Sequence, residues 1–345
     1  MTESPERDVA AFKTDFTRLM TEVGKVIVGQ HEVVEQALIA LVAGGHVLLE
    51  GVPGLGKTLL VKTMADALSL QFNRIQFTPD LMPADIVGTR VIVESESGAK
   101  EFVFRQGPVF ANILLADEIN RATPKTQSAL LEAMQEQTVT VFGEQHKLPH
   151  PFLTLATQNP MEQEGTYPLP EAQLDRFFFK ILVPRPGLAD VIDICDRTTG
   201  VAVSRAGKVL DGPRILEMRD LSRRIPVPMP VKSYAVRCVM ATQPDADAKI
   251  SSVKQYVRYG ASPRGAQALL LACKVRALLS GRTNVAFEDV KALAKPVLRH
   301  RTIVNFEAEA EGISSDKIIE DILAGTREVG EEVVAIAAES ARRPR

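Results

Sequence analysis

The sequence contains few cysteines and few aromatic residues. Its 345 residues include three cysteines, four tyrosines and no tryptophan. Cys195, Cys238 and Cys273 are odd in number and lack C-x-x-C spacing, which argues against a disulfide framework and against a zinc cluster. We therefore expect a reducing compartment, the cytoplasm, and cysteines that pack as small hydrophobic side chains.

The sequence also lacks a long hydrophobic run and an excess of either charge. The longest apolar stretch, residues 37–49, is shorter than the roughly 18 to 20 residues that cross a bilayer. The N-terminus begins with charged, acidic residues, unlike a signal peptide. The 41 Lys and Arg residues nearly balance the 43 Asp and Glu residues, so the composition predicts neither a nucleic-acid partner nor membrane insertion.

Length and apolar periodicity predict two domains. An amphipathic helix is expected within residues 1–25. From residue 26 to 185, apolar runs of strand length alternate with helical patterns, which predicts an α/β domain with a doubly wound parallel sheet. Residues 186–325 read as wholly helical, so we expect a smaller C-terminal all-α domain, followed by a tail at 326–345. The expected strands lie at residues 45–50, 72–77, 110–116, 152–157 and 177–183.

Two segments interrupt this alternation and are predicted to be β-hairpins inserted into the α/β domain. The first spans about residues 89–105, with arms at 90–93 and 101–104 around a turn that contains Ser-Gly. The second spans about residues 137–152 around Gly143, with residues 138–141 as one arm and the chain from Phe152 onward as the other. Such insertions usually project from the sheet.

A glycine-rich segment follows the first expected strand and precedes a helical pattern. It fits G-x-x-x-x-G-K-[ST], the phosphate-binding loop. Its glycines allow a tight turn that aims backbone amides and a helix N-terminus at phosphate oxygens. We expect Lys57 to contact the β- and γ-phosphates of ATP and the Thr58 hydroxyl to bind Mg²⁺. The predicted nucleotide-binding residues here are Gly51, Val52, Pro53, Gly54, Leu55, Gly56, Lys57 and Thr58.

Two acidic residues, Asp117 and Glu118, follow the apolar residues at the end of an expected strand. Asp117 is placed to bind Mg²⁺, and Glu118 to orient and polarise the attacking water as a general base. Capping of the following helix explains one carboxylate but not both. A further strand leads to Asn159, which lies between the two phosphate motifs if these strands are neighbours. There it could hold the lytic water or sense the γ-phosphate, although Asn-Pro is also a common turn.

Taken together, these segments resemble the MoxR family of AAA+ ATPases, in the helix-2-insert clade of that superfamily. The resemblance covers about residues 10–325 and implies a P-loop NTPase core with an α-helical lid. The Walker motifs are generic, whereas the segments at 78–83 and 164–177 are specific to the family. The matching segments are residues 51–58, 77–83, 107–112, 115–122, 156–160, 164–177 and 260–265.

The resemblance implies further roles for polar residues. Asn159 would be sensor 1, Arg176 the arginine finger that reaches a neighbour's γ-phosphate, and Arg264 sensor 2. A local ion pair with Glu171 or Asp175 is the alternative for Arg176, because these acids are close in sequence. For Arg264, the alternative is a solvated arginine in a basic stretch. The two hairpins would be the helix-2 and pre-sensor-1 insertions.

Two further segments each have two alternative roles. Ile27, Val28 and Gly29 resemble the stretch that packs against adenine in this superfamily, and plain core packing is the alternative. Arg121 follows the two acids and acts either across a subunit boundary or structurally.

These residues predict an Mg²⁺-dependent ATPase that cleaves the β–γ phosphoanhydride of ATP. A ring, most simply a hexamer of this chain, follows if Arg176 acts in trans. The resemblance further implies chaperone-like remodelling or maturation of a protein client, with a partner that carries a von Willebrand factor A domain. The alternatives are a magnesium-chelatase-like ATPase subunit, an AAA+ nucleic-acid motor or transcription activator, and a nucleotide-gated binding module that scarcely hydrolyses ATP.

Overall fold

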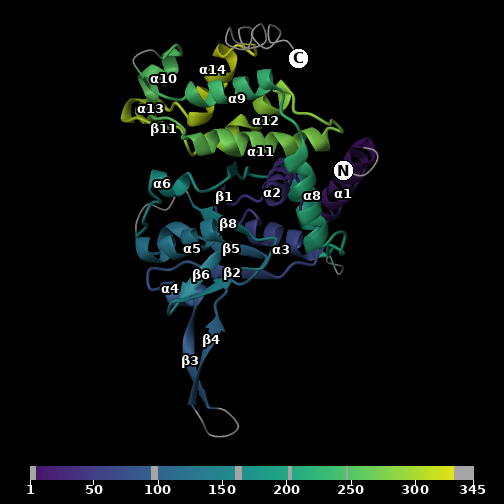
Figure 1. Cartoon of the computed structure of the whole chain (residues 1–345), viewed down its shortest axis with the longest axis vertical. Coiled ribbons are helices and arrows are strands. Elements are labelled where there is room, and N and C mark those ends of the chain that lie inside the picture. Colours follow the sequence, from purple (N-terminus) through teal and green to yellow (C-terminus); the bar gives the residue numbers. More distant parts are fainter. Residues whose placement is uncertain (1–4, 95–99, 160–164, 201–203, 246–247, 330–345) are drawn as a thin grey trace, which may run out of the picture. The chain divides into compact units, whose positions relative to one another are not determined.

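The computed structural model describes residues 5–94, 100–159, 165–200, 204–245 and 248–329 (Figure 1). The chain divides into two compact units. The sheet unit contains the described parts of Thr17–Phe177 and Ile181–Glu217, and the helical unit those of Met1–Phe16, Phe178–Lys180 and Met218–Arg345. Most of the expected C-terminal tail lies outside the described residues.

The sheet unit is built on five strands in the order β2-β5-β8-β1-β9. Neighbouring pairs β2·β5, β5·β8 and β8·β1 are parallel. Each strand falls within or beside a stretch that the sequence predicted as a strand, so the expected α/β fold with a parallel sheet is confirmed. The strands are β1 (Val47–Glu50), β2 (Phe72–Gln76), β5 (Ile113–Asp117), β8 (Leu153–Gln158) and β9 (Phe179–Leu182).

Apolar side chains on both faces of this sheet are buried, which explains why its central strands are nearly all hydrophobic. On one face, Leu48, Leu114 and Ala156 pack in a cluster with residues of α5 (Pro124–Glu136). Two further helices of the unit are α2 (His31–Ala43), which is buried along most of its length, and α3 (Lys57–Leu68), which contacts β5. An amphipathic helix, α1 (Pro5–Gly24), begins the described chain.

The first predicted hairpin is β3 (Gly88–Glu94) paired antiparallel with β4 (Lys100–Gln106). It follows the short helix α4 (Pro83–Val87) and projects away from the sheet in Figure 1. The second hairpin differs from its prediction. Its arms are β6 (Thr138–Val141) and β7 (Glu144–Lys147), whereas the chain from Phe152 onward enters the central sheet as β8. The chain reverses at Phe142 and Gly143, both with positive φ, so the turn lies where the sequence predicted it and only the second arm was wrong.

The two hairpins contact each other through a small group of side chains, the hairpin joint, which consists of Arg90, Phe104, Phe142, Glu144 and His146. Arg90 and Phe104 are cross-strand partners in the first hairpin. The Arg90 guanidinium forms an ion pair with Glu144 and lies 5.6 Å from the ring centroid of Phe142. The rings of Phe104 and His146 stack with centroids 4.1 Å apart. Because charged and aromatic contacts coincide here, the bases of the hairpins are fastened together.

The helical unit confirms the expected lid domain. Its helices include α11 (Pro263–Leu279), which begins after the N-cap Ser262 as the sequence predicted. A short antiparallel pair, β10 (Val257–Tyr259) with β11 (Ile303–Val304), accompanies the helices. The remaining helices from residue 212 onward are α8 (Gly212–Arg224), α9 (Met229–Met240), α10 (Ser251–Tyr256), α12 (Phe287–Leu298), α13 (Phe306–Glu311) and α14 (Ser315–Gly325).

The cysteines are all free, but only two of them pack as expected. Cys238 and Cys273 are buried, and burial raises the pKa of the Cys238 thiol to about 11. Cys195 is exposed on α7 (Leu188–Thr199), so the expectation of a packed side chain was wrong there. The described chain contains no helix that is both long and apolar enough to cross a membrane.

Asp289→Ala should destabilise the helical unit more than any ordinary surface substitution. The Asp289 side chain is 1% exposed, accepts from both terminal nitrogens of Arg282, and accepts from the backbone amide of Ala286, the N-cap residue of α12. Its loss leaves these donors without their acceptor, at a cost of about 3 kcal/mol, the low end for a buried pair because Arg282 is partly exposed. Urea unfolding followed by circular dichroism measures the change. Glu320→Ala, which removes the exposed ion pair with Lys295, is the control and should cost less than about 1 kcal/mol. Equal losses in the two variants would contradict a structural role for Asp289.

Candidate active site

The predicted phosphate-binding loop lies between the end of β1 and the start of α3. Gly54 and Gly56 have φ values of 82° and 74°, in the left-handed region that glycine adopts without strain. A Cβ at either position would meet nothing within 4 Å, so backbone conformation, not space, requires these glycines. Gly51 is different, because a Cβ there would lie 3.0 Å from Val183. The loop therefore leaves open space beside its two central glycines.

Lys57 begins α3 and lies across this loop. Its Nζ donates to the carbonyl oxygen of Gly51 at 2.6 Å. Burial lowers the pKa of Lys57, and the carboxylates of Asp117, Glu118 and Glu50 oppose that shift. The ammonium of Lys57 is therefore within electrostatic reach of both acids that the sequence singled out.

Asp117 and Glu118 lie at the carboxyl end of β5, and Thr157 of the adjacent strand β8 holds them. The buried Thr157 hydroxyl donates to Asp117 Oδ1 at 2.6 Å and accepts from the Glu118 backbone amide at 2.8 Å. Glu118 has φ 56°, an unusual value for a residue other than glycine, which turns the chain sharply after the strand. One hydroxyl thus fixes both the carboxylate of Asp117 and the turn that carries Glu118.

The exposed face of the edge strand β2 also contacts the two acids. Arg74 Nε and Nη2 lie 3.2 and 2.6 Å from Asp117 Oδ2. Gln76 Nε2 donates to Glu118 Oε2 at 2.8 Å, and Arg121 Nη1 donates to the same oxygen at 2.9 Å. Arg121 therefore pairs with Glu118 of its own subunit, one of the two possibilities that the sequence left open.

The segment that resembles an adenine-contacting stretch lies beside the phosphate loop. Gln30 Nε2 donates to the carbonyl oxygen of Leu55 at 2.9 Å. Gly29 has φ 69°, and a Cβ there would lie 2.5 Å from the carboxyl carbon of Asp190 on α7. Ile27 is buried, at 8% exposure. The segment is thus held between the loop and α7.

Asn159 follows β8, the strand between β1 and β5 in the sheet. Since β1 leads to the phosphate loop and β5 ends in the two acids, Asn159 lies between the two motifs, as the sequence predicted for neighbouring strands. Its side chain is buried.

The fully buried Gln127 of α5 connects this helix to the segments that follow β5 and β8. Its amide nitrogen lies within hydrogen-bond distance of the carbonyl oxygens of Ile119, Ala122 and Tyr167.

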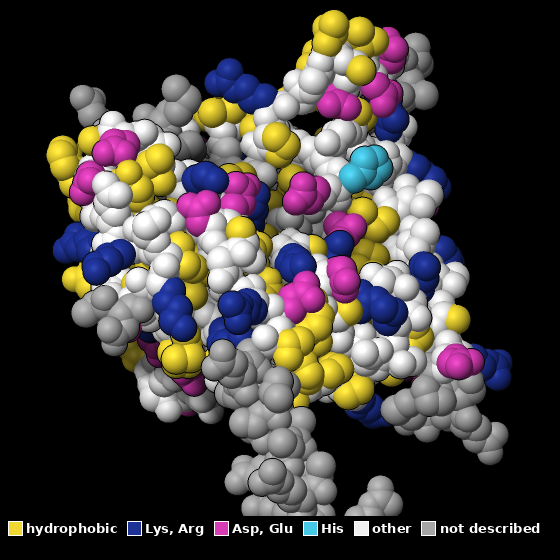
Figure 2. All heavy atoms as spheres, turned by 90° about the horizontal axis from the view of Figure 1, so that it is seen from above, with side chains coloured by type: hydrophobic (Ala, Val, Ile, Leu, Met, Phe, Trp, Pro, Cys, Tyr) yellow, Lys and Arg dark blue, Asp and Glu magenta, His cyan; other side chains and the backbone are white. Residues whose placement is uncertain are grey.

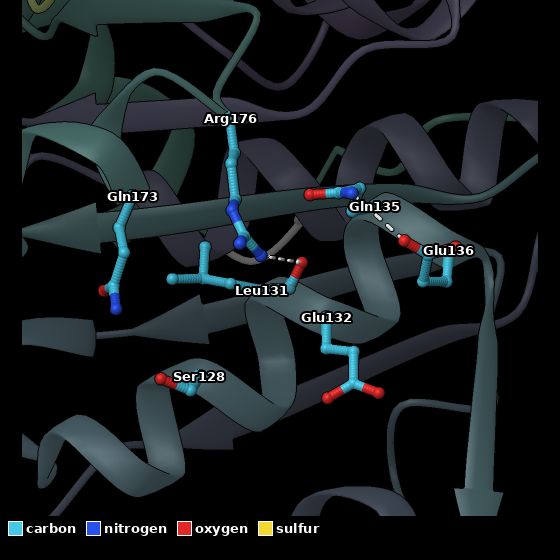
Figure 3. A pocket seen from close by; sticks show the side chains of 7 residues that line it. All are labelled: Ser128, Leu131, Glu132, Gln135, Glu136, Gln173 and Arg176. Carbon is cyan, nitrogen blue, oxygen red and sulfur yellow. Dashed lines mark hydrogen bonds between the residues drawn. The ribbon is translucent and has the colours of Figure 1, made fainter.

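Arg176 follows the short helix α6 (Glu171–Leu174) and points toward α5 (Figure 3). Its Nη1 donates to the carbonyl oxygen of Leu131 at 3.2 Å. The surrounding pocket is polar and is lined by Ser128, Leu131, Glu132, Gln135, Glu136, Gln173 and Arg176. The guanidinium therefore lies in a surface pocket and contacts an uncharged main-chain group.

Arg264 is exposed in the first turn of α11, where its backbone amide donates to the hydroxyl of the N-cap Ser262. It belongs to the helical unit, whereas the phosphate loop belongs to the sheet unit. Its role as sensor 2 stays a prediction.

Thr58 and Asp117 offer the oxygen ligands that Mg²⁺ prefers. Thr58 lies in the first turn of α3, next to Lys57, whose ammonium is within electrostatic reach of Asp117. The donor set of the sheet unit therefore fits a hard divalent cation bound beside a phosphate group.

Sequence reasoning missed Arg74, Gln76 and Thr157. Arg74 and Gln76 alternate with the buried Ile75, so they share the exposed face of β2. Thr157 is one of three polar residues of β8, which reads Leu-Thr-Leu-Ala-Thr-Gln, and is the last residue but one of that strand. These positions could have been noticed as polar residues at the carboxyl ends of neighbouring strands, where sites form in parallel sheets.

Comparisons with known proteins point to one group of ATPases. The family model described as "ATPase family associated with various cellular activities (AAA)" matches residues 46–179, and the AAA lid domain model matches residues 250–322. Chaperone MoxR1 of Mycobacterium tuberculosis is 45% identical over 306 residues, which cover 89% of this chain and 80% of that protein. Protein MoxR of Methylorubrum extorquens is 32% identical over 317 residues, 86% of this chain and 88% of that protein.

A solved structure agrees with these relatives. A protein from Cytophaga hutchinsonii, described as a candidate ATPase, superposes with a TM-score of 0.87 at 41% identity, over 94% of this chain and 98% of that one. The similarity thus extends over the sheet unit and the helical unit alike.

Proposed function

Because the chain belongs to the MoxR family of AAA+ ATPases, we propose that it hydrolyses MgATP within a ring of identical subunits, a hexamer, and uses the hydrolysis to remodel or mature a protein client. One observation carries the hydrolytic part of this proposal. The phosphate loop follows β1 and the two acids lie at the end of β5, and both strands pair in parallel with β8, so Lys57 and the acids lie at the same edge of the sheet although sixty residues separate them.

The loop would bind the nucleotide through its main-chain amides and Lys57. The positive end of α3 and the amides near Gly54 and Gly56 favour phosphate oxygens. Lys57 would exchange its contact with the Gly51 carbonyl for the β- and γ-phosphates. Thr58 and Asp117 would hold Mg²⁺, which neutralises charge on the phosphates when it is bound.

Glu118 would act on the attacking water. Its carboxylate accepts the proton as the water oxygen attacks the γ-phosphorus, and the bond from the γ-phosphorus to the bridging oxygen breaks to give ADP and phosphate. Thr157 holds the backbone turn that carries Glu118, and Gln76 and Arg121 contact the carboxylate itself. Asn159 lies between the motifs, where an amide can orient the water or contact the γ-phosphate.

Lys57→Ala should reduce ATP affinity by at least tenfold, because the phosphates lose their only point charge in the loop; charged hydrogen bonds contribute about 1.5–3 kcal/mol. Isothermal titration of MgATP measures the change. The matched control is Lys62→Ala, which removes an exposed lysine from the same helix and should leave the affinity unchanged. ATP affinity within about threefold of wild type in Lys57→Ala would contradict the loop assignment.

The proposal of a ring depends on Arg176 acting across a subunit interface. We propose that its guanidinium leaves the Leu131 carbonyl and contacts the γ-phosphate bound to a neighbouring subunit, since a rigid, permanently charged fork suits that contact. The position of Arg176 in a surface pocket supports this role. Arg264 would contact the nucleotide from the lid as sensor 2, and Ile27, Val28 and Gly29 would pack against the adenine.

The client is proposed to be a protein, consistent with the chaperone name of the relative from Mycobacterium tuberculosis. The first hairpin supports this, because the cross-strand pair Ile92 and Phe102 is 60% and 71% exposed. Large exposed apolar side chains on a projecting ribbon suit contact with another protein. The partner with a von Willebrand factor A domain, implied by the family resemblance, would bind the same assembly. Free cysteines favour a cytoplasmic location.

The other functions are less well supported. On the face shown in Figure 2, Lys and Arg side chains are interspersed with Asp, Glu and apolar side chains, unlike the continuous basic surface of many nucleic-acid motors. The identity to MoxR proteins favours that family over a magnesium-chelatase-like subunit. A steady-state ATPase assay distinguishes an enzyme from a nucleotide-gated binding module.

A further inference from the structure

The carboxylate of Asp117, the proposed magnesium ligand, has a hydrogen-bond donor on each oxygen. Thr157 donates to Oδ1 at 2.6 Å, and Arg74 approaches Oδ2 with two nitrogens, at 3.2 and 2.6 Å. Thr157 comes from a neighbouring strand and is buried, so it is a fixed support. Arg74 is different, because its side chain is 46% exposed on the edge strand β2 and can move into solvent.

The same guanidinium is connected to the second acid. Arg74 Nη2 also donates to Gln76 Oε1 at 2.7 Å, and Gln76 Nε2 donates to Glu118 Oε2 at 2.8 Å. The register of the parallel strands explains this, because Gln76 is the cross-strand partner of Asp117 and Arg74 lies two residues earlier on the same face. Asp117, Arg74, Gln76 and Glu118 therefore form one continuous hydrogen-bonded chain.

We propose that Arg74 competes with Mg²⁺ for the carboxylate of Asp117, whose Oδ2 accepts from the guanidinium. This inference rests on the proposed function, since it assumes that Asp117 binds Mg²⁺ beside ATP. In the metal-free protein, Arg74 neutralises Asp117 beside the neighbouring Glu118. Two positive charges at contact distance from one carboxylate repel each other, so metal binding would displace the Arg74 guanidinium toward solvent.

Such competition predicts a modest change in metal affinity when Arg74 is removed, and it fixes the direction of that change. An ion pair whose arginine is half exposed is screened by water, so a metal ion held also by phosphate oxygens displaces it. Removal of Arg74 should therefore tighten metal binding. A purely structural arginine predicts the opposite or nothing, because loss of a supporting contact on Asp117 leaves the ligand less well placed.

The test measures metal binding directly. Mn²⁺, which electron paramagnetic resonance detects, is titrated into protein loaded with a slowly hydrolysed ATP analogue and freed of unbound nucleotide. Arg74→Gln should lower the Mn²⁺ dissociation constant by about three- to tenfold, or roughly 0.6–1.4 kcal/mol. The control is Arg105→Gln, which removes the same charge from an exposed position on β4 and should leave the constant unchanged.

A second background distinguishes competition from a general charge effect. In Asp117→Asn protein, Arg74 has no carboxylate to occupy, so adding Arg74→Gln should change Mn²⁺ binding by less than twofold. Arg74→Lys, which keeps the charge, should shift the constant less than Arg74→Gln does.

Three results would overturn the inference: equal or weaker Mn²⁺ binding in Arg74→Gln, the same gain in the Asp117→Asn background, or failure of Arg74→Gln to fold in EDTA, which would show a structural role. These are distinct from failure of the proposed function. If wild-type protein binds neither the ATP analogue nor Mn²⁺, the proposed function fails, whereas metal binding in wild type with no change in the variant rejects only the role of Arg74.

Discussion

Mixing Arg176→Ala protein with Lys57→Ala protein should restore ATP hydrolysis that neither variant has alone. Arg176→Ala keeps an intact phosphate loop but lacks the guanidinium, and Lys57→Ala has the guanidinium but cannot bind ATP well. In a mixed ring, Arg176 of one variant serves ATP bound to the other. An arginine supplied in trans contributes about 10³–10⁵ in rate, so even a small fraction of productive interfaces gives a measurable signal.

The single variant has its own expected result. Arg176→Ala should bind MgATP within about threefold of wild type while hydrolysis falls by about 10³-fold or more. Loss of the hydrogen bond to Leu131 should cost only about 1 kcal/mol of stability, so the protein remains folded. Arg185→Ala, an exposed arginine a few residues further along, is the matched control and should retain activity. If rings shown to contain both variants recover no hydrolysis, Arg176 acts in cis or structurally.

Glu118→Gln should slow ATP hydrolysis by about 10²–10⁴-fold while ATP binding stays near the wild-type level. The amide has the shape of the carboxylate and can still accept from Gln76 and Arg121, so the local contacts persist. It cannot take a proton from water, so the general base is lost. Stopped-flow measurement of phosphate release, with binding measured separately, tests both parts.

The control for this variant is Glu101→Gln, which neutralises an exposed acid on β4 and should hydrolyse ATP normally. The trapped ATP-bound state of Glu118→Gln should also favour the assembled ring, which analytical ultracentrifugation detects. Turnover within about threefold of wild type would mean that another group activates the water.

The sequence predicted those parts of the site that are contiguous in the chain. The phosphate loop consists of consecutive residues, and Asp117 and Glu118 are adjacent in the sequence. Each motif follows a strongly apolar strand. Arg74 is 43 residues from Asp117, and only the register of β2 with β5 brings them together. No short motif encodes the register between strands. The sequence therefore did not predict the hydrogen bonds that connect Arg74 with Asp117 and, through Gln76, with Glu118.

Most of the fold was predicted for the same reason, because its strands are strongly apolar. The prediction was wrong at β7, a strand made of polar residues. β7 is Glu-Gln-His-Lys, with no apolar alternation, whereas Phe152 begins a clearly apolar run. The prediction therefore gave the second arm of the hairpin to the wrong segment. β7 is stabilised instead by the contacts of Glu144 with Arg90 and of His146 with Phe104. These partners lie 54 and 42 residues earlier in the chain, beyond the range of a local sequence pattern.

The hairpin joint has a mechanical consequence. With seven residues in each strand, the β3–β4 ribbon is about 23 Å long, and Arg90 and Phe104 lie near its base. β6 follows directly after α5, the helix that Gln127 ties to the segment behind Glu118. The joint therefore connects the base of the ribbon to the segment that follows α5. If α5 tilted while these contacts held, the base of the ribbon would turn with it, and residues further along the ribbon would move further than those at its base.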